Sequence, residues 1–324
     1  MPAKLEMPSP SVAGSGSRRP MTNAGDETQL RIQEGVLLGH ALVARLADSL
    51  GIRVFFIKGP ASVIQGLREA KISADVDVFV DPSRLKELLQ SLYERGWRQR
   101  PSDPDNITFP KHSMTLDHPE WPCCVDVHFR FPGMEKPHTD CFEYLWQHTV
   151  NMELAGQQLR IPSKELGTLF LALHALRSPE LPACRQELQY LAGVVRRESQ
   201  SEPLLELATA TGALAAVRPF LESLLPESVS PAWPAPSQEW RNRVAAQAPG
   251  SARLLAILQA PWNEKPRMLW GALFPTREVF LSGNIYADLS MSGRLRQHRN
   301  RWWRFVRALP RIMRSLRKLS ASGD

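Results

Sequence analysis

Residues 75–80 read D-V-D-V-F-V, and this stretch decides the fold. Successive side chains of a β-strand point to opposite faces, so Asp75 and Asp77 share one face and the three valines share the other. We expect the valines to face a core. Two carboxylates on one face repel each other, which is tolerable where water or a divalent cation lies between them. The stretch therefore predicts a strand whose acidic face is either solvated or a metal site.

A second apolar stretch carries another carboxylate. Residues 123–129 read C-C-V-D-V-H-F, which places Asp126 and His128 on one face of a strand. A third carboxylate on a neighbouring strand completes what two-metal phosphoryl transfer requires, because two cations ~3.5–4 Å apart then hold the attacking and leaving oxygens. Mg²⁺ prefers such oxygen ligands.

The turn Lys58-Gly59 is the third informative feature. It follows R-V-F-F-I at residues 53–57, a run typical of a buried strand, and Pro60 suits the first turn of a helix. Gly59 lets a phosphate approach the backbone, the start of a helix offers N–H groups, and Lys58 adds a positive charge.

In chain order these three parts resemble the nucleotidyltransferase fold of the DNA polymerase beta superfamily. The chain is more closely similar to a family of uncharacterised bacterial nucleotidyltransferases with the motifs L-K-G, D-I-D-L-L-V and V-D-L-H-W. The matching stretches are residues 57–59, 75–80 and 125–129. Lys71 stands where the family commonly has Arg, and His112 matches a family histidine. Weaker similarity continues at residues 171–174 and 273–275.

The resemblance implies an enzyme that moves a nucleoside monophosphate from an NTP, such as ATP, to an acceptor hydroxyl, with Mg²⁺ or Mn²⁺ as cofactor. Its catalytic residues and metal ligands would be Asp75, Asp77 and Asp126. The resemblance implies that the nucleotide is bound by Lys58, Gly59, Lys71, His112 and His128. The motifs name neither the acceptor nor the preferred base.

Two alternatives stay open. Pro60 and Ala74 stand where the superfamily usually has serine, which motivates a non-catalytic module of the same fold that binds a nucleotide or a partner protein. A metal-dependent glycosyl- or phospho-modifying transferase in a biosynthetic cluster is the other, because D-x-D also holds nucleotide-sugar diphosphates. Only one strand–helix unit precedes D-x-D here, whereas a doubly wound sugar-nucleotide domain needs more.

The predicted fold class is α+β, a mixed β-sheet flanked by helices and followed by a mostly helical region. Residues 1–25 are rich in Pro, Ser and Gly and are expected to be a disordered leader. We expect the catalytic domain at 26–160, a helical domain at 161–290 and a basic amphipathic helix at 291–324. His174 is expected in the core or between domains, and Arg68 on a solvated face.

The net charge of +7 over 324 residues is uneven. Between residues 293 and 319 there are ten Lys and Arg and no acid, which leaves 30 Lys and Arg against 33 Asp and Glu elsewhere. The body is therefore not a general polyanion binder. We expect a terminal helix, kinked at Pro310, that packs its apolar stripe on the body while its arginines stay in water. The alternative is that this basic helix contacts an anionic membrane surface, RNA or an anionic substrate.

We expect neither a membrane span nor a secretory signal in this sequence. No apolar run approaches the ~20 residues of a membrane span, and the first residues have no apolar segment typical of a secretory signal. The four cysteines form no C-x-x-C pair, so neither a zinc site nor a disulfide framework is indicated. We expect a cytoplasmic protein with reduced thiols.

Overall fold

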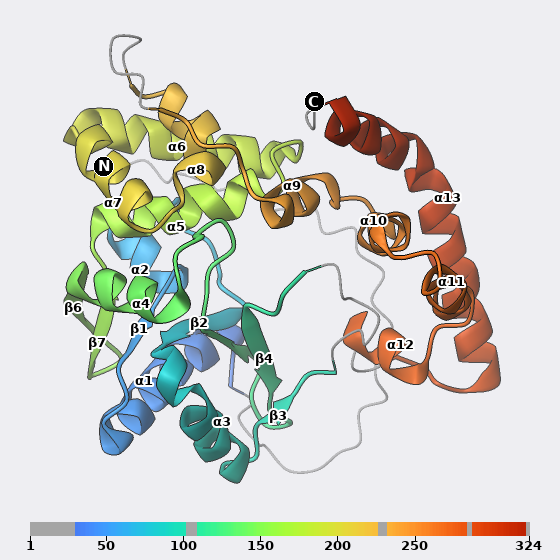
Figure 1. Ribbon diagram of the computed structural model, residues 1–324. Helices are drawn as coiled ribbons and strands as arrows, with labels where there is room; N and C mark the ends of the chain where they lie inside the picture. The colour runs from blue at the N-terminus through green and yellow to red at the C-terminus, as the bar shows by residue number, and fades with distance from the viewer. Residues whose placement is uncertain (1–29, 102–108, 226–231, 284–286, 322–324) are drawn as a thin grey trace, which may run out of the picture.

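The computed structural model describes residues 30–101, 109–225, 232–283 and 287–321, so the leader predicted at 1–25 lies outside the described residues. The fold is α+β, with a mixed five-stranded sheet and helices followed by a largely helical C-terminal region (Figure 1). Within the described residues, no helix has both the length and the hydropathy that a membrane span requires.

The sheet has the strand order β1-β2-β5-β4-β3. Its strands are β1 (Val54–Phe56), β2 (Asp75–Val80), β3 (Arg98–Gln99), β4 (Ser113–Asp117) and β5 (Cys124–His128). The central pair β2 and β5 is parallel and the other pairs are antiparallel. The predicted strand at 75–80 is confirmed to the residue, whereas the two-residue β3 is too short for a sequence pattern.

One face of the sheet is covered by α1 (Ile32–Leu50) and α3 (Leu85–Glu94). The short α2 (Gly59–Ile64) follows β1. Gly51 adopts a left-handed φ of 62° and ends α1, a conformation that glycine takes without the steric cost of a side chain. The three valines of β2 are buried in this core, which confirms the face predicted for them.

The opposite face of the sheet is also buried. Phe79, which shares its face of β2 with Asp75 and Asp77, stacks on Phe55 of β1 with ring centroids 5.1 Å apart. Phe142 of α4 (His138–Gln147) and Phe170 of α5 (Lys164–Leu176) complete this aromatic cluster. The face of β2 that carries Asp75 and Asp77 is therefore not wholly solvated, because Phe79 on the same face is buried in a core.

Helices α5 to α8 form the layer beyond this second face (Figure 1). They are α5, α6 (Pro182–Glu198), α7 (Ser201–Ala210) and α8 (Leu214–Glu222). The Ser163 hydroxyl accepts from the N–H of Leu166 and caps α5, as serine commonly does at the start of a helix. The hairpin of β6 (Thr149–Leu154) and β7 (Gln157–Pro162) and the helix α4 are not predicted, although polar and apolar residues alternate along T-V-N-M-E-L.

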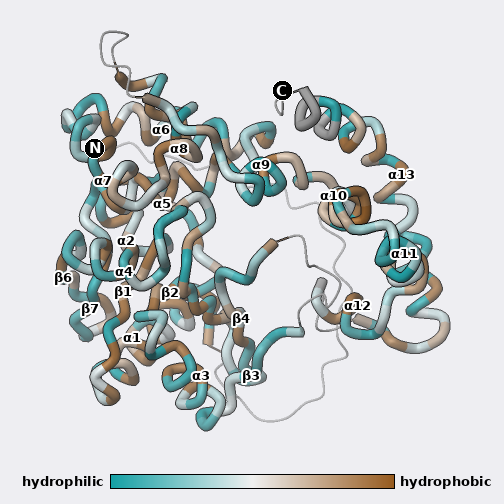
Figure 2. Tube along the Cα trace, in the orientation of Figure 1, coloured by the Kyte–Doolittle hydropathy of each residue, from teal (hydrophilic) through white to brown (hydrophobic). Residues whose placement is uncertain are grey.

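The C-terminal region consists of α9 (Gln238–Ala245), α10 (Ser251–Gln259), α11 (Lys265–Leu273), α12 (Arg277–Gly283) and α13 (Met291–Ala321). Helix α13 continues through Pro310, and hydrophobic and hydrophilic residues alternate along it (Figure 2). Ala308 and Ile312 are buried, so part of its apolar stripe packs on the body. Its Trp303 remains 56% exposed.

Candidate functional site

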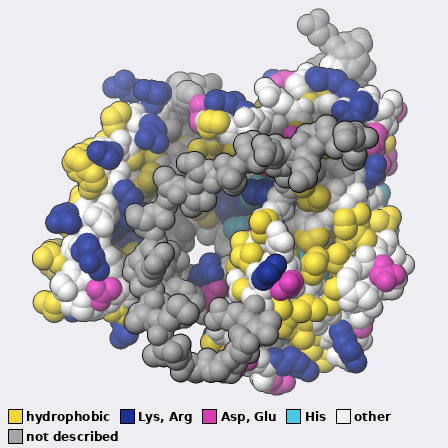
Figure 3. Space-filling view, turned by 180° about the vertical axis from the view of Figure 1, so that it is seen from behind, with side chains coloured by type: hydrophobic (Ala, Val, Ile, Leu, Met, Phe, Trp, Pro, Cys, Tyr) yellow, Lys and Arg dark blue, Asp and Glu magenta, His cyan; other side chains and the backbone are white. Residues whose placement is uncertain are grey.

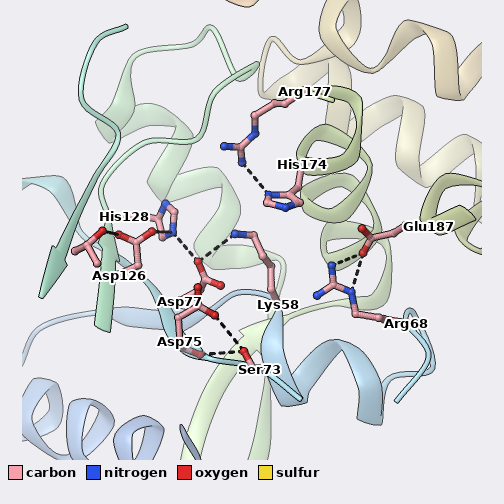
Figure 4. A network of polar contacts seen from close by, with 11 residues as sticks. Lys58, Arg68, Ser73, Asp75, Asp77, Asp126, His128, His174, Arg177 and Glu187 are labelled. Atoms are coloured by element: carbon pink, nitrogen blue, oxygen red, sulfur yellow. Dashed lines mark hydrogen bonds and ion pairs between the residues drawn. The ribbon is translucent and has the colours of Figure 1, made fainter. Parts of the chain in front are cut away.

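Two carboxylates meet where the central strands run side by side. β2 and β5 are parallel, and their register sets Asp77 opposite Asp126. The His128 Nε2–H lies 2.9 Å from Asp77 Oδ1 and 3.0 Å from Asp126 Oδ2, between the two side chains (Figure 4). Ligand atoms of these three residues lie within 4.8 Å of one another. The site therefore combines two acidic oxygens and one imidazole in a space that a single cation can span.

Two further side chains hold the carboxylates in place. Lys58 Nζ donates to Asp77 Oδ1 at 3.1 Å, and the Thr115 hydroxyl of β4 donates to Asp126 Oδ1 at 3.0 Å. Asp77 is 6% exposed and His128 is 2% exposed. Buried carboxylates require such partners, because an unpaired buried charge is costly.

The environment keeps both carboxylates ionised. Burial alone raises the pKa of Asp77, but the hydrogen bond from His128 and the charge of Lys58 outweigh it, so this pKa lies far below its usual value. Burial likewise acts on Asp126, yet His128 lowers the Asp126 pKa to about 2. For His128, burial disfavours the charged form, but the hydrogen bonds to Asp126 and Asp77 outweigh it and raise its pKa. The ionised carboxylates of Asp77 and Asp126 are therefore weak bases and suitable ligands for a cation.

Asp75 lies on the same face as Asp77, one pleat away, but outside the group of three ligand residues. Burial and the neighbouring Asp77 charge raise the Asp75 pKa. The Ser73 hydroxyl donates to the Asp75 carboxylate at 3.2 Å. A serine two residues before the first aspartate therefore supplies the hydroxyl that Ala74 lacks.

The Lys58-Gly59 turn lies directly against the acidic pair. Both residues have positive φ, 63° for Lys58 and 54° for Gly59. Such a backbone is uncommon for lysine and costs about 1–3 kcal/mol, so surrounding contacts must hold it. The Nζ–Asp77 bond is one such contact. Beside the turn, His40 donates from Nδ1 to the Val36 carbonyl at 2.7 Å, while its Nε2 is buried without a hydrogen-bond partner.

The other two predicted nucleotide-binding residues, His112 and Lys71, differ in where they lie relative to the carboxylates. The His112 ring lies 5.9 Å from the His128 ring, and burial together with the charge of Arg243 lowers the His112 pKa to about 2. Lys71 is exposed and acts electrostatically on Cys184. Arg68, expected on a solvated face, instead bonds to Glu187 of α6, with its Nε 2.7 Å from the carboxylate.

Three residues at the site are not identified by sequence motifs. Thr115 reaches Asp126 from β4, and His40 reaches the turn from α1. Arg177 follows α5 and bonds to His174 from Nη2 to Nδ1 at 3.3 Å. The only local signal for this contact is spacing, because residues three apart on a helix are neighbours. Figure 4 shows both side chains projecting from α5 toward Lys58 and Asp77.

A separate cavity of about 860 Å³ lies between α10, α11, α12 and α13. Its lining is mostly apolar and includes Arg253, Arg296 and Arg304, but none of the acidic residues above. It therefore belongs to the C-terminal helices and not to the strand site.

Comparisons with known proteins give one family and several structures. A family model described as uncharacterised nucleotidyltransferase matches residues 27–196. No curated protein matches the chain. A nucleotidyltransferase-like protein from Paracoccidioides brasiliensis has 16% identity and a TM-score of 0.36, covering 59% of this chain and 92% of that one. The antibiotic-resistance factor ANT(2'')-Ia has 14% identity and a TM-score of 0.36, covering 59% and 95%.

Proposed function

We propose that this chain, which belongs to the family of uncharacterised nucleotidyltransferases, transfers a nucleoside monophosphate from an NTP to an acceptor hydroxyl. The observation that carries the proposal is the register that sets Asp77 beside Asp126 on parallel strands, with both carboxylates ionised. In the transfer, the acceptor oxygen bonds to the α-phosphorus, the bond from that phosphorus to the β-phosphate oxygen breaks, and pyrophosphate leaves. The acceptor hydroxyl gives up its proton to solvent water.

The donor set fits Mg²⁺ or Mn²⁺. Asp77 and Asp126 would hold the cation, with Asp75 one pleat away as a further carboxylate. The cation would supply positive charge to the transferring phosphoryl group. The chain's own residues orient the site, because Lys58, His128 and Thr115 fix the two carboxylates before any substrate arrives. Asp126 is a poor base at a pKa of about 2, so we assign it to ligation.

We also propose that the predicted nucleotide-binding residues contribute unequally to nucleotide binding. Lys58, Gly59 and His128 lie at the carboxylates, and His112 lies beside His128, so these would meet the phosphates or the sugar. Lys71 is exposed and would act on the nucleotide only through its charge at longer range. The acceptor would be a compound with a hydroxyl group that reaches this acidic face.

A non-catalytic nucleotide-binding module is the competing proposal. Its support is the Gly59-Pro60 turn, because proline removes one N–H that would face a phosphate, and Lys58 Nζ is bonded to Asp77. The two proposals differ in one product, since only nucleotidyl transfer releases pyrophosphate.

We infer that α13 faces an anionic membrane surface. Large apolar side chains of this region stay exposed beside its arginines: Trp262, Trp270, Phe274, Trp302, Trp303, Val306 and Met313. Trp and Arg together suit the interface of a membrane, where an aromatic ring enters the headgroup layer and cations meet anionic lipid. This contact would be separate from the strand site.

The central test is labelling by NTPs. The full chain is incubated with each α-labelled NTP, Mg²⁺ or Mn²⁺ and a cell lysate, and label transfer and pyrophosphate are measured. We expect Asp77→Asn and Asp126→Asn each to lower labelling by at least about 100-fold, the loss typical of one electrostatic group at a reacting centre.

Asp48→Asn is the matched control, because Asp48 is exposed on α1, which covers the opposite face of the sheet. Labelling that survives in both cluster variants would overturn the proposal. NTP binding by the intact chain without pyrophosphate release would favour the non-catalytic module.

A further inference from the structure

Arg177 is a largely enclosed cation at the end of α5. In the described part of the chain, no carboxylate lies within ion-pair distance of it, and its Nε is buried without a hydrogen-bond partner. Its protein contacts are the His174 ring nitrogen and the face of Phe131, 5.0 Å from the guanidinium carbon. Burying a guanidinium without an anion beside it is unfavourable. The environment of Arg177 therefore favours binding of a negatively charged ligand.

Two more arginines, Arg130 and Arg243, share one acid, and Arg243 acts electrostatically on Arg177. Arg130 Nη2 and Arg243 Nε bond to the two oxygens of Glu239 at 2.5 and 2.9 Å. Burial and the charge of Arg243 together lower the Arg177 pKa to about 10, while Asp77 and Asp126 oppose them, so the two guanidiniums act on each other. In the described part of the chain, Glu239 is thus the one carboxylate paired with these arginines. Figure 3 shows Lys, Arg and His side chains within a hollow of one face.

The charges of the site are separated in space. Carboxylates occupy the sheet, whereas the guanidiniums come from the loop after β5, the end of α5 and α9. Asp77 and Asp126 act electrostatically on Arg177, so the two sides face each other. A complex of a divalent cation with a polyphosphate has the matching polarity, with its cation toward the carboxylates and its remaining negative charge toward the arginines.

We infer that Arg177, positioned by His174 and backed by Arg243, binds the polyphosphate tail of the NTP. The identity of this anion rests on the proposed nucleotidyl transfer, whereas the existence of the anion subsite does not. A guanidinium fork binds phosphate oxygens in pairs, and it stabilises the charge that develops on departing pyrophosphate. The subsite also supplements the Lys58-Gly59-Pro60 turn, where proline offers no N–H and Lys58 bonds to Asp77.

His174 is a positioning residue in this arrangement. Burial and the charge of Lys58 lower its pKa to about 2, so its ring is neutral and Nδ1 can accept from Arg177. Arg177 then presents its other N–H groups to the ligand.

The test is calorimetric titration of inorganic pyrophosphate into the full chain in the presence of a metal chelator. We expect Arg177→Gln to weaken pyrophosphate binding roughly 10–100-fold, the range of a hydrogen-bonded charge. Arg177→Lys should fall between, because lysine keeps the charge and loses the fork. Arg218→Gln is the matched control, since Arg218 on α8 is exposed and pairs with Glu222.

The subsite and the reaction can fail separately. Asp77→Asn should retain pyrophosphate binding in chelator while it loses labelling, so a chain that labels nothing can still confirm the subsite. An intact chain that does not bind pyrophosphate, or an Arg177→Gln variant that binds it as tightly as the intact chain, would overturn the inference. If Arg177→Gln does not fold by circular dichroism, Arg177→Lys against the intact chain decides the question.

Discussion

At the scale of single residues, His128 is the link between the two carboxylates. Its Nε2 lies within 3.0 Å of both, and its Nδ1 is buried without a hydrogen-bond partner. The D-x-H spacing places His128 and Asp126 on one face of β5, but it contains nothing about a bond to Asp77 on another strand. This bond depends on the register of two segments about 50 residues apart.

Replacing His128 should change the pH dependence of stability. The His128 pKa in the folded chain is raised above 6.5 by Asp126 and Asp77, against the effect of burial. The stabilisation is complete below the unfolded pKa and is lost as pH rises through the raised folded pKa. We therefore expect His128→Gln to lower the free energy of unfolding more at pH 6 than at pH 9, measured by urea unfolding in chelator. An equal or larger effect at pH 9 would contradict this assignment.

At the scale of elements, β2 is held by a core on each face. Its valines enter the core beneath α1 and α3, and Phe79 enters the aromatic cluster with Phe55, Phe142 and Phe170. Burial on both sides explains how a strand that carries two aspartates is held between two cores. Residue alternation predicts the strand itself, whereas the second core comes from helices more than 60 residues away.

Shortening Phe79 should destabilise the protein strongly. Its ring is 1% exposed, and Phe→Ala in a core costs about 3–5 kcal/mol because a cavity is left. Urea unfolding of Phe79→Ala should show this loss, with Phe79→Leu intermediate. Leu38→Ala serves as control, because Leu38 on α1 is 45% exposed and surface changes stay within about 0.5 kcal/mol. A Phe79→Ala variant as stable as Leu38→Ala would disprove the second core.

At the scale of the whole molecule, positive charge and exposed aromatic rings gather on the same C-terminal helices. Arg307 lies over the Trp303 ring at 4.4 Å, and Lys265 lies over the Trp262 ring at 4.3 Å, where Trp262 is 85% exposed. The buried Ala308 and Ile312 account for only part of the α13 stripe. The remaining exposed surface combines positive charge with aromatic rings, and both bind to membrane interfaces.

We expect the intact chain to bind vesicles that contain anionic lipid and not zwitterionic ones, and added salt should weaken the binding. The triple change of Arg304, Arg307 and Arg311 to Gln should weaken it about 100-fold, at roughly 1 kcal/mol per cation near the surface. Vesicle cosedimentation measures this. Changing the exposed Arg185, Arg196 and Arg197 of α6 to Gln removes the same charge elsewhere and is the control. Tight RNA binding without vesicle binding would assign the helix to RNA instead.

The amino-acid sequence alone determined the acidic strand, the turn before it, the second strand and the helical character of the C-terminal region, because alternation and helical spacing are local properties of the chain. Only the tertiary structure decided that Asp126 lies opposite Asp77, that His128 joins them while Asp75 lies outside this group, and that Arg177 arrives from α5. These relations arise from strand register and from packing between distant segments. No local pattern encodes them, since their energy exists only once the elements meet.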